Sequence, residues 1–121
     1  MTHVWRAGDL GWLDFSPSRG GEQAGRRPAL VVSARRLTEV TGLAIVCPIT
    51  GRPKGYPTNV RIVGVRDPET GAARPLIDGE VLCAQVRAVD TRQRGFAYAG
   101  QHAPAATLAQ VRAILRALLQ D

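Results

Sequence analysis

The stretch Arg19-Gly20-Gly21-Glu22-Gln23-Ala24-Gly25-Arg26-Arg27-Pro28 leads directly into the apolar run Ala29-Leu30-Val31-Val32. Its glycines predict a mobile loop, and two adjacent arginines stand where an apolar strand should begin. A polar loop anchored on a rigid strand is a common way to present catalytic or binding groups. By itself the stretch is better explained as a solvated hairpin connection, so a functional loop needs support from the rest of the chain.

Short runs typical of strands lie on either side of this loop. They are rich in β-branched and aromatic residues or alternate polar with apolar positions, and Gly, Pro and charged segments separate them. A proline such as Pro28 is tolerated at the first residue of a strand. Residues 34–41 predict a single helical turn. The predicted strands are residues 9–15, 29–33, 43–49, 59–63, 81–89 and 96–100.

The C-terminal segment predicts an amphipathic helix. After Pro104, which suits a first helical turn, Leu108, Val111, Leu115 and Leu118 recur at spacings of three and four. Strands and helices do not alternate, so a parallel doubly wound sheet is not expected. The fold class is therefore mainly β: a small, strongly bent antiparallel barrel, with the helix covering one face. Residues 64–79, rich in Gly, Pro and charge, predict a long excursion or a poorly ordered insertion.

Length and composition place the chain among globular proteins of one domain. The 121 residues are expected to form a single domain spanning 1–121, with 45% hydrophobic and 21% charged residues. No apolar run approaches the ~20 residues needed to span a bilayer, and the N-terminus lacks the apolar region of a signal peptide. We therefore expect a cytoplasmic protein with no membrane association.

The charge of the chain favours a polyanionic partner. The net charge is +6 and the isoelectric point is near 10.6. Such a bias suits nucleic acid, because cationic side chains neutralise phosphates and release counterions. Lys54 is the only lysine, and the other cations are arginines.

Several kinds of chemistry lack the residues they need. Cys47 and Cys83 lie inside apolar runs and predict two buried thiols, and no close cluster of Cys and His offers a metal site. His3 and His102 lie near opposite ends of the chain, and we interpret them as exposed surface histidines. No phosphate-binding glycine loop or dinucleotide fingerprint occurs. We expect no metal and no cofactor.

The remaining candidates are arginines and hydroxyls, and these suit RNA cleavage. RNA carries its own nucleophile, the 2′-OH, so an enzyme must stabilise phosphorane-like oxygens and protonate the leaving 5′-oxygen. A guanidinium donates paired hydrogen bonds to phosphate, and a threonine hydroxyl can donate another. Arg27 and Thr50 both fall at the ends of apolar strands, where a rigid backbone would hold them. Exposed surface residues are the alternative reading of both.

In several motifs the chain resembles the MazF/PemK toxins. The similarity is carried first by residues 8–33, which contain Glu22-Gln23-Ala24-Gly25-Arg26-Arg27-Pro28. Further matches follow in order along nearly the whole chain. They are Thr41-Gly42-Leu43, Cys47-Pro48-Ile49-Thr50 with Lys54-Gly55-Tyr56-Pro57, Gln85-Val86-Arg87 and the terminal helix.

The resemblance implies an SH3-like barrel that acts as a homodimeric toxin of a type II toxin–antitoxin module. Such toxins are mRNA interferases. The implied activity is metal-independent, sequence-specific cleavage of single-stranded RNA, which leaves a 2′,3′-cyclic phosphate and a 5′-OH. By similarity, Arg27 and Thr50 are the catalytic residues. The residues expected to bind RNA are Asp14, Phe15, Glu22, Gln23, Arg26, Lys54 and Gln85.

An arginine is a poor general base, because its pKa exceeds ~12. We therefore assign Arg27 to charge stabilisation first and proton donation second. The expected protein partner is a MazE-like antitoxin with an acidic segment that mimics RNA phosphates.

The sequence departs from the family pattern at Ala84, where many relatives have Asp, at Thr58, and in the long excursion from Arg66 to Ile77. These departures bear on which RNA motif is cut. Two alternatives to the nuclease remain open. One is a non-enzymatic, CcdB-like gyrase inhibitor on the same fold, and the other is a plain nucleic-acid-binding barrel.

Overall fold

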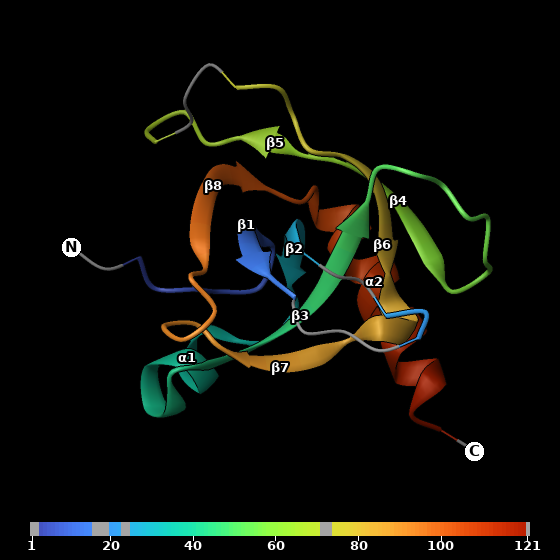
Figure 1. Cartoon of the computed structure of the whole chain (residues 1–121), viewed down its shortest axis with the longest axis horizontal. Helices are drawn as coiled ribbons and strands as arrows, with labels where there is room; N and C mark the ends of the chain where they lie inside the picture. The colour runs from blue at the N-terminus through green and yellow to red at the C-terminus, as the bar shows by residue number, and fades with distance from the viewer. Residues whose placement is uncertain (1–2, 16–19, 23–24, 71–73, 121) are drawn as a thin grey trace.

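The computed structural model describes residues 3–15, 20–22, 25–70 and 74–120. Over these residues eight strands form one antiparallel sheet, which curls into a nearly closed barrel (Figure 1). The expected small antiparallel barrel with a C-terminal helix is confirmed. The strands are β1 (Asp9–Asp14), β2 (Arg26–Val31), β3 (Leu43–Thr50), β4 (Asn59–Val63), β5 (Val65–Arg66), β6 (Asp78–Leu82), β7 (Arg87–Asp90) and β8 (Ala97–His102).

The strand order places the two ends of the predicted loop at the centre of the sheet. Neighbouring strands follow the order β4-β6-β3-β2-β1-β8-β5, and β7 pairs with the first half of β3. The long strand β3 therefore pairs with β2 on one edge and with β7 and then β6 on the other. The ends of β2 and β3 lie side by side, and they carry Arg27 and Thr50.

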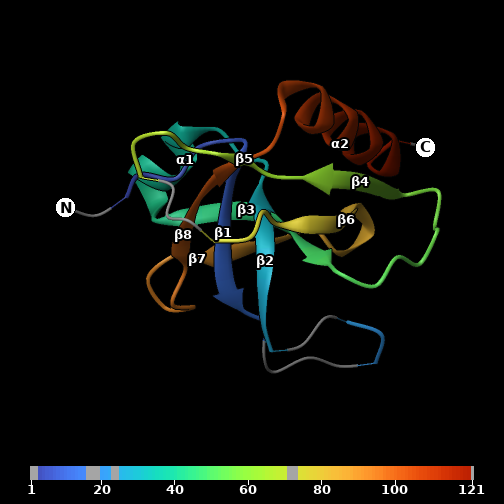
Figure 2. The ribbon, with the colours of Figure 1, turned by 90° about the horizontal axis from the view of Figure 1, so that it is seen from above.

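Side chains alternate across this sheet and fill two cores. Leu10, Leu30 and Cys47 belong to the first core, which α2 (Ala105–Leu118) covers by burying Val111. Leu13 and Val31 belong to the second core, which Trp5 closes from the N-terminal segment. Figure 2 shows α2 lying across β4. None of the helices in the described part of the chain is long and apolar enough to cross a membrane.

The structure corrects the predicted strand over residues 81–89. This run begins as β6 but is interrupted by a 3₁₀ turn, η1 (Cys83–Gln85), and resumes as β7. The turn lets the chain leave one end of β3 and rejoin the same strand further along, where Ala88 pairs with Ile45. Neither residue at the break, Leu82 or Cys83, is Gly or Pro, so the local sequence does not indicate an interruption of the strand. The predicted helical turn is the helix α1 (Arg35–Thr41).

The structure also corrects the interpretation of the two histidines as exposed. His3 is half-buried, its Nε2 lies 2.8 Å from Oδ2 of Asp9, and its ring stacks on Tyr98 at 4.0 Å between centroids. His102 ends β8 and is half-buried, with Nδ1 enclosed. Both cysteines are free and fully buried, as predicted. The hydrogen bond with Cys83 and burial raise the pKa of the Cys47 thiol.

Candidate active site

Arg27 and Thr50 occupy matching positions on neighbouring strands. In the β2–β3 ladder Ala29 pairs with Pro48. The ladder ends at this pair, and continuing its register by two residues on each strand matches Arg27 with Thr50. Two-residue alternation then places both side chains on one face of the sheet.

The row of side chains continues across the sheet to Glu80 and Arg61. Thr50 pairs with Glu80 in the β3–β6 ladder, and Glu80 pairs with Arg61 in the β6–β4 ladder. Four strands thus contribute one polar residue each to a single row. The row thus contains two guanidinium groups, one hydroxyl and one carboxylate.

Thr50 is held rigidly, because it is only 4% exposed and its Oγ1 accepts the backbone N–H of Arg52 at 3.1 Å. A hydroxyl that accepts one hydrogen bond can still donate its own proton. The approach of β6 that encloses Thr50 depends on Gly79, since a Cβ there would collide with the Thr50 carbonyl oxygen. The Thr50 hydroxyl is therefore held in a tightly packed part of the barrel.

Glu80 is the residue of this region that the sequence did not reveal. Its Oε1 accepts the backbone N–H of Lys54 at 2.8 Å and that of Gly55 at 3.4 Å. The side-chain amide of Asn59 donates to the same oxygen at 3.2 Å. One carboxylate thus ties the loop that follows Thr50 to β6. The only sequence signal was a charged residue immediately before the predicted strand over residues 81–89.

These hydrogen bonds also set the charge of Glu80. The N–H of Lys54 is the largest cause that holds the pKa of the Glu80 carboxyl below its ordinary value, and burial works in the opposite direction. A carboxylate with a lowered pKa is a weak general base. Glu80 therefore suits the task of holding the Lys54 loop better than that of taking a proton.

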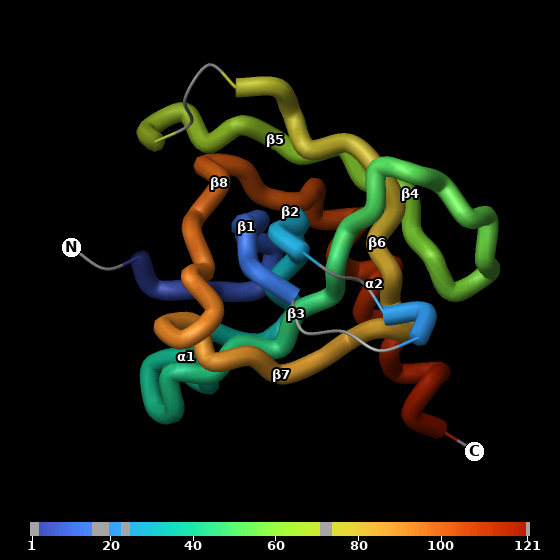
Figure 3. Tube along the Cα trace, in the orientation of Figure 1, coloured from blue at the N-terminus to red at the C-terminus, as the bar shows by residue number. Residues whose placement is uncertain are grey.

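The described residues of the loop between β1 and β2 form hydrogen bonds with Phe15 and with η1. The N–H of Phe15 donates to the Gly25 carbonyl at 2.9 Å, which closes the base of the loop. The Gln85 side-chain amide donates to the Gly21 carbonyl at 3.4 Å. Figure 3 shows this part of the loop beside the connection between β6 and β7. The predicted residues Glu22 and Gln85 are thereby brought to one region, with Glu22 exposed.

The other predicted RNA-binding residues differ in their access to solvent. Lys54 is exposed, and Asp14 and Arg26 are exposed cross-strand partners at the ends of β1 and β2. Phe15 is 1% exposed and belongs to the second core, with the Arg87 guanidinium 6.0 Å from the centre of its ring. Gln23 lies outside the described residues. Within the described ranges, no three His, Cys, Asp or Glu side chains are grouped as metal ligands would be.

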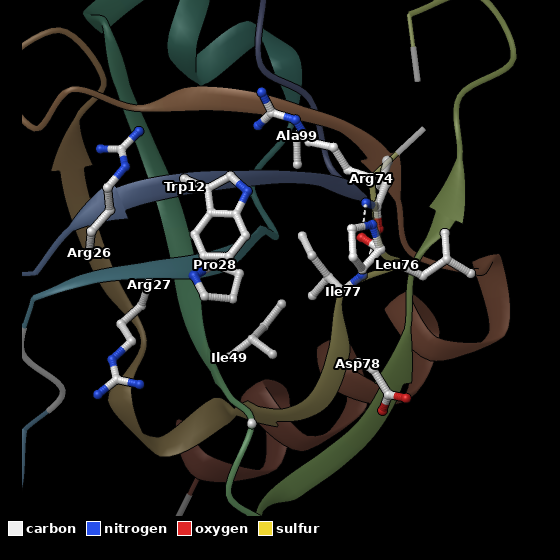
Figure 4. A pocket seen from close by; sticks show the side chains of 13 residues that line it. Trp12, Arg26, Arg27, Pro28, Ile49, Arg74, Leu76, Ile77, Asp78 and Ala99 are labelled. Carbon is white, nitrogen blue, oxygen red and sulfur yellow. Dashed lines mark hydrogen bonds between the residues drawn. The ribbon is translucent and has the colours of Figure 1, made fainter. Parts of the chain in front are cut away.

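A pocket of about 460 Å³ opens beside Arg27 (Figure 4). Apolar side chains form its floor and arginines stand at its rim. Its lining residues are Trp12, Arg26, Arg27, Pro28, Ile49, Gly51, Arg74, Pro75, Leu76, Ile77, Asp78, Ala99 and Gln101.

Comparison with known proteins assigns this architecture. Residues 6–119 match a family model described as the PemK-like, MazF-like toxin of type II toxin–antitoxin systems. The chain belongs to the PemK/MazF toxin family. It is 39% identical over 97 residues to the endoribonuclease toxin MazF of Escherichia coli K12, covering 80% of this chain and 78% of that protein. It is 32% identical over 93 residues to the E. coli endoribonuclease PemK, covering 73% of this chain and 62% of that protein.

Solved structures agree with the family assignment. The crystal structure of MazF from Deinococcus radiodurans superposes with a TM-score of 0.81 at 42% identity, covering 98% of both chains. A MazE–MazF crystal structure from the same organism matches with a TM-score of 0.73 at 39% identity, covering 98% of this chain and 97% of that one. The predicted family and fold are confirmed, and the prediction of an endoribonuclease toxin is confirmed at the level of the family.

Proposed function

We propose that the chain cleaves single-stranded RNA at short, specific sequences without a metal ion. The 2′-OH loses its proton and attacks the adjacent phosphorus, the bond to the 5′-oxygen breaks, and that oxygen takes up a proton, so that the products carry a 2′,3′-cyclic phosphate and a 5′-OH. The observation that carries this proposal is the register that sets Arg27 level with Thr50 on one face of the sheet. Membership of the PemK/MazF family supports it.

Arg27 supplies the electrostatic part of the reaction. Its guanidinium donates two hydrogen bonds to the non-bridging oxygens, whose negative charge grows in the transition state. The Thr50 hydroxyl, fixed by Arg52 and by its burial, donates a third. Rigid donors aimed at developing charge need no reorganisation during the reaction, and loss of one such donor typically costs about 10²–10³ in kcat.

The exposed cations beside Arg27 and Thr50 suit RNA binding. Lys54 stands on the loop that Glu80 holds, and Arg26 stands beside Arg27 at the start of β2. We assign Lys54, Arg26, Asp14, Glu22, Gln23 and Gln85 to RNA contact. We assign Phe15 to the support of this surface from below.

The partners follow from charge and family. A net charge of +6 suits an acidic antitoxin segment that occupies the RNA-binding surface, and MazF of D. radiodurans has been crystallised with MazE. We propose a MazE-like antitoxin as the protein partner and a homodimer as the active form. The matched family favours the nuclease over the gyrase-inhibitor alternative.

The test is cleavage of a long single-stranded RNA in excess EDTA, followed by mapping of the new 5′ ends. We expect discrete cuts, 5′-OH ends and losses of about 10²–10³ in kcat for Arg27→Ala and for Thr50→Ala. Arg36→Ala, which removes an exposed arginine of α1, is the matched control and should cut like wild type. Full activity in both site variants would refute the assignment of the catalytic pair.

A further inference from the structure

We infer that the pocket beside Arg27 is a base-binding subsite that receives one RNA base against Trp12, with Arg26 and Arg74 on the flanking phosphates. The inference deepens the proposed function and rests on it, because it names the part of the substrate that this pocket holds. None of the residues that carry it, Arg26 excepted, was predicted from the sequence to bind RNA.

Strand alternation places Trp12 and Pro28, in the floor of this pocket, on the face of the sheet opposite to the catalytic row, and Arg27 lines the pocket from the end of β2. Arg27 shares the face of Ala29, whereas its neighbours Arg26 and Pro28 share the face of Leu30. Pro28 pairs with Trp12 in the β1–β2 ladder, so the indole lies beside the proline ring (Figure 4). The pocket therefore lies one residue away from the catalytic pair, around the end of β2.

The floor of the pocket suits an aromatic base. Trp12 is half-buried, so its ring is accessible, and Pro28, Ile49, Ile77 and Ala99 surround it with apolar surface. A volume of about 460 Å³ falls in the usual range of roughly 300–1,000 Å³ for small-ligand sites. Proteins that bind single-stranded nucleic acid commonly stack bases on aromatic side chains in this way.

The rim of the pocket suits phosphate. Arg26, Arg27 and Arg74 all line it, and Arg26 is steadied by donating to the Gly95 carbonyl at 3.3 Å. The carboxylate among the lining residues, Asp78, forms an ion pair with Arg61. The charge facing the pocket is therefore positive, around an apolar floor. A nucleotide combines these two requirements, a flat ring and an adjacent anion.

Residues 74–77, the described end of the excursion after β4, build the far wall of the pocket, which gives this limb a role. Gln101 is 4% exposed, and its Oε1 accepts the Ile77 N–H at 2.8 Å while its Nε2 donates to the Pro75 carbonyl at 3.1 Å. Gly64 leaves room for Gln101, because a Cβ at Gly64 would collide with Oε1. The returning limb that carries Arg74 is thus fastened to β8. A wall supplied by a segment of unusual length and sequence is suited to setting base preference.

The test follows the indole N–H signals of Trp12 and Trp5 by NMR in the Thr50→Ala protein, which leaves every lining residue of the pocket in place and in which cleavage should be slowed about 10²–10³-fold. The probe is a degenerate RNA hexanucleotide, and inorganic polyphosphate provides the charge without bases. We expect RNA to shift the Trp12 signal and polyphosphate to leave it in place. Trp5, which is 4% exposed and stacked on Phe96, should stay unchanged as the internal reference.

Two variants with matched controls locate the effect. Ala99→Leu fills the pocket and should abolish the Trp12 shift, whereas Ala88→Leu, at an exposed position of β7, should not. Arg74→Ala should weaken RNA binding about tenfold and reduce the slope of log affinity against log salt by about 0.7, the value for one phosphate contact in a single strand. Arg36→Ala should keep the wild-type slope. In otherwise wild-type protein, Ala99→Leu should also change the base preference at one position of the mapped cleavage sites.

The outcomes separate this inference from the proposed function. A Trp12 signal that RNA leaves in place, or that polyphosphate shifts equally, overturns the subsite even if the wild-type protein cuts RNA. A Trp12 shift that RNA causes, that polyphosphate does not cause and that Ala99→Leu removes supports the subsite. This holds even if the wild-type protein cuts no RNA and the proposed function fails.

Discussion

Glu80 lies directly opposite Thr50 in the β3–β6 ladder, and its carboxylate accepts the backbone N–H of Lys54 at 2.8 Å. The residue next to the proposed catalytic hydroxyl therefore also fixes the loop that carries a proposed RNA contact. This relationship links the position of Thr50 to that of Lys54 through one side chain.

Loss of this link should weaken RNA binding more than chemistry. We predict that Glu80→Ala raises KM about tenfold and lowers kcat by a smaller factor. Both effects should stay below the roughly hundredfold loss of rate that a catalytic group misplaced by ~1 Å can cause. Glu80→Gln should retain most of the activity, because its amide oxygen can still accept from Lys54 and Gly55. Steady-state kinetics on one RNA substrate measures both.

Hydrogen exchange at Lys54 and Gly55 distinguishes this effect from a general loss of stability. Exchange should speed up at these two amides in Glu80→Ala and stay slow in Glu39→Ala, which removes an exposed carboxylate of α1. Equal KM values for Glu80→Ala and wild type would contradict the role given to Glu80.

Asp67 should make the fold sensitive to acid. The Glu69 N–H, followed by the hydroxyls of Thr70 and Tyr98, lowers the pKa of the Asp67 carboxyl from 3.8 to about 2. A carboxyl whose pKa is lowered by folding stabilises the fold at any pH above the pKa of that carboxyl in the unfolded chain. This contribution is lost as the pH falls from about 4 toward 2. In denaturant titrations across this range, Asp67→Asn should lose less stability than wild type. Parallel curves for the two proteins would show that Asp67 does not contribute.

The same contact has an effect at alkaline pH. Burial, with the hydrogen bond to Asp67 as the next cause, raises the pKa of Tyr98 from 10.0 to about 12. A raised pKa means that the stability held by the neutral phenol is present below pH 10 and is lost as the pH rises toward 12. Absorbance titration should show one phenol ionising near pH 12, and Asp67→Asn should lower that midpoint. A midpoint unmoved by Asp67→Asn would rule out their coupling.

Gly79 should be intolerant of a side chain. A Cβ at this position meets the Thr50 carbonyl oxygen, so Gly79→Ala must push β6 away from β3. Overpacking of this kind typically costs ~1–3 kcal/mol, and thermal unfolding measures it. Gly51→Ala is the control, since an added Cβ there has open space. Equal melting temperatures for the two variants would show that the strands can separate without cost.

The sequence predicted the barrel because its signals are local. Alternating and apolar runs marked most strands, and the spacing of Leu108, Val111 and Leu115 marked the C-terminal helix. The break at Cys83 could not be predicted, because it arises where one chain segment pairs with two parts of β3. The two-residue strand β5 likewise exists only through its pairing with β8.

The candidate site was predictable only in part, for the same reason. Arg27 and Thr50 stood at strand ends next to recognisable motifs, whereas Glu80 acquires its role from the pairing of β6 with β3 and from hydrogen bonds 25 and 26 positions away. Trp12 and Arg74 are distant in sequence and meet at one pocket through the fold. His3 was interpreted as exposed because its partner Asp9 could not be identified from spacing alone.

The geometry of the guanidinium at position 27 should matter beyond its charge. Arg27→Lys keeps the positive charge but loses the paired donors that match two phosphate oxygens. We predict that it recovers only part of the 10²–10³-fold loss expected for Arg27→Ala. Single-turnover cleavage rates at saturating enzyme isolate this effect from binding. Full activity in Arg27→Lys would mean that a point charge suffices.

The most direct measurement uses a substrate with a single atom removed. Once the cut sites are mapped, one RNA is synthesised with a 2′-deoxynucleotide immediately 5′ of the scissile phosphate and compared with its all-ribose counterpart in excess EDTA. Attack by the 2′-OH, assisted by Arg27 and Thr50, predicts that the all-ribose RNA is cut to a cyclic phosphate and a 5′-OH while the substituted RNA stays intact. Cleavage of both substrates at the same bond and rate would contradict the account.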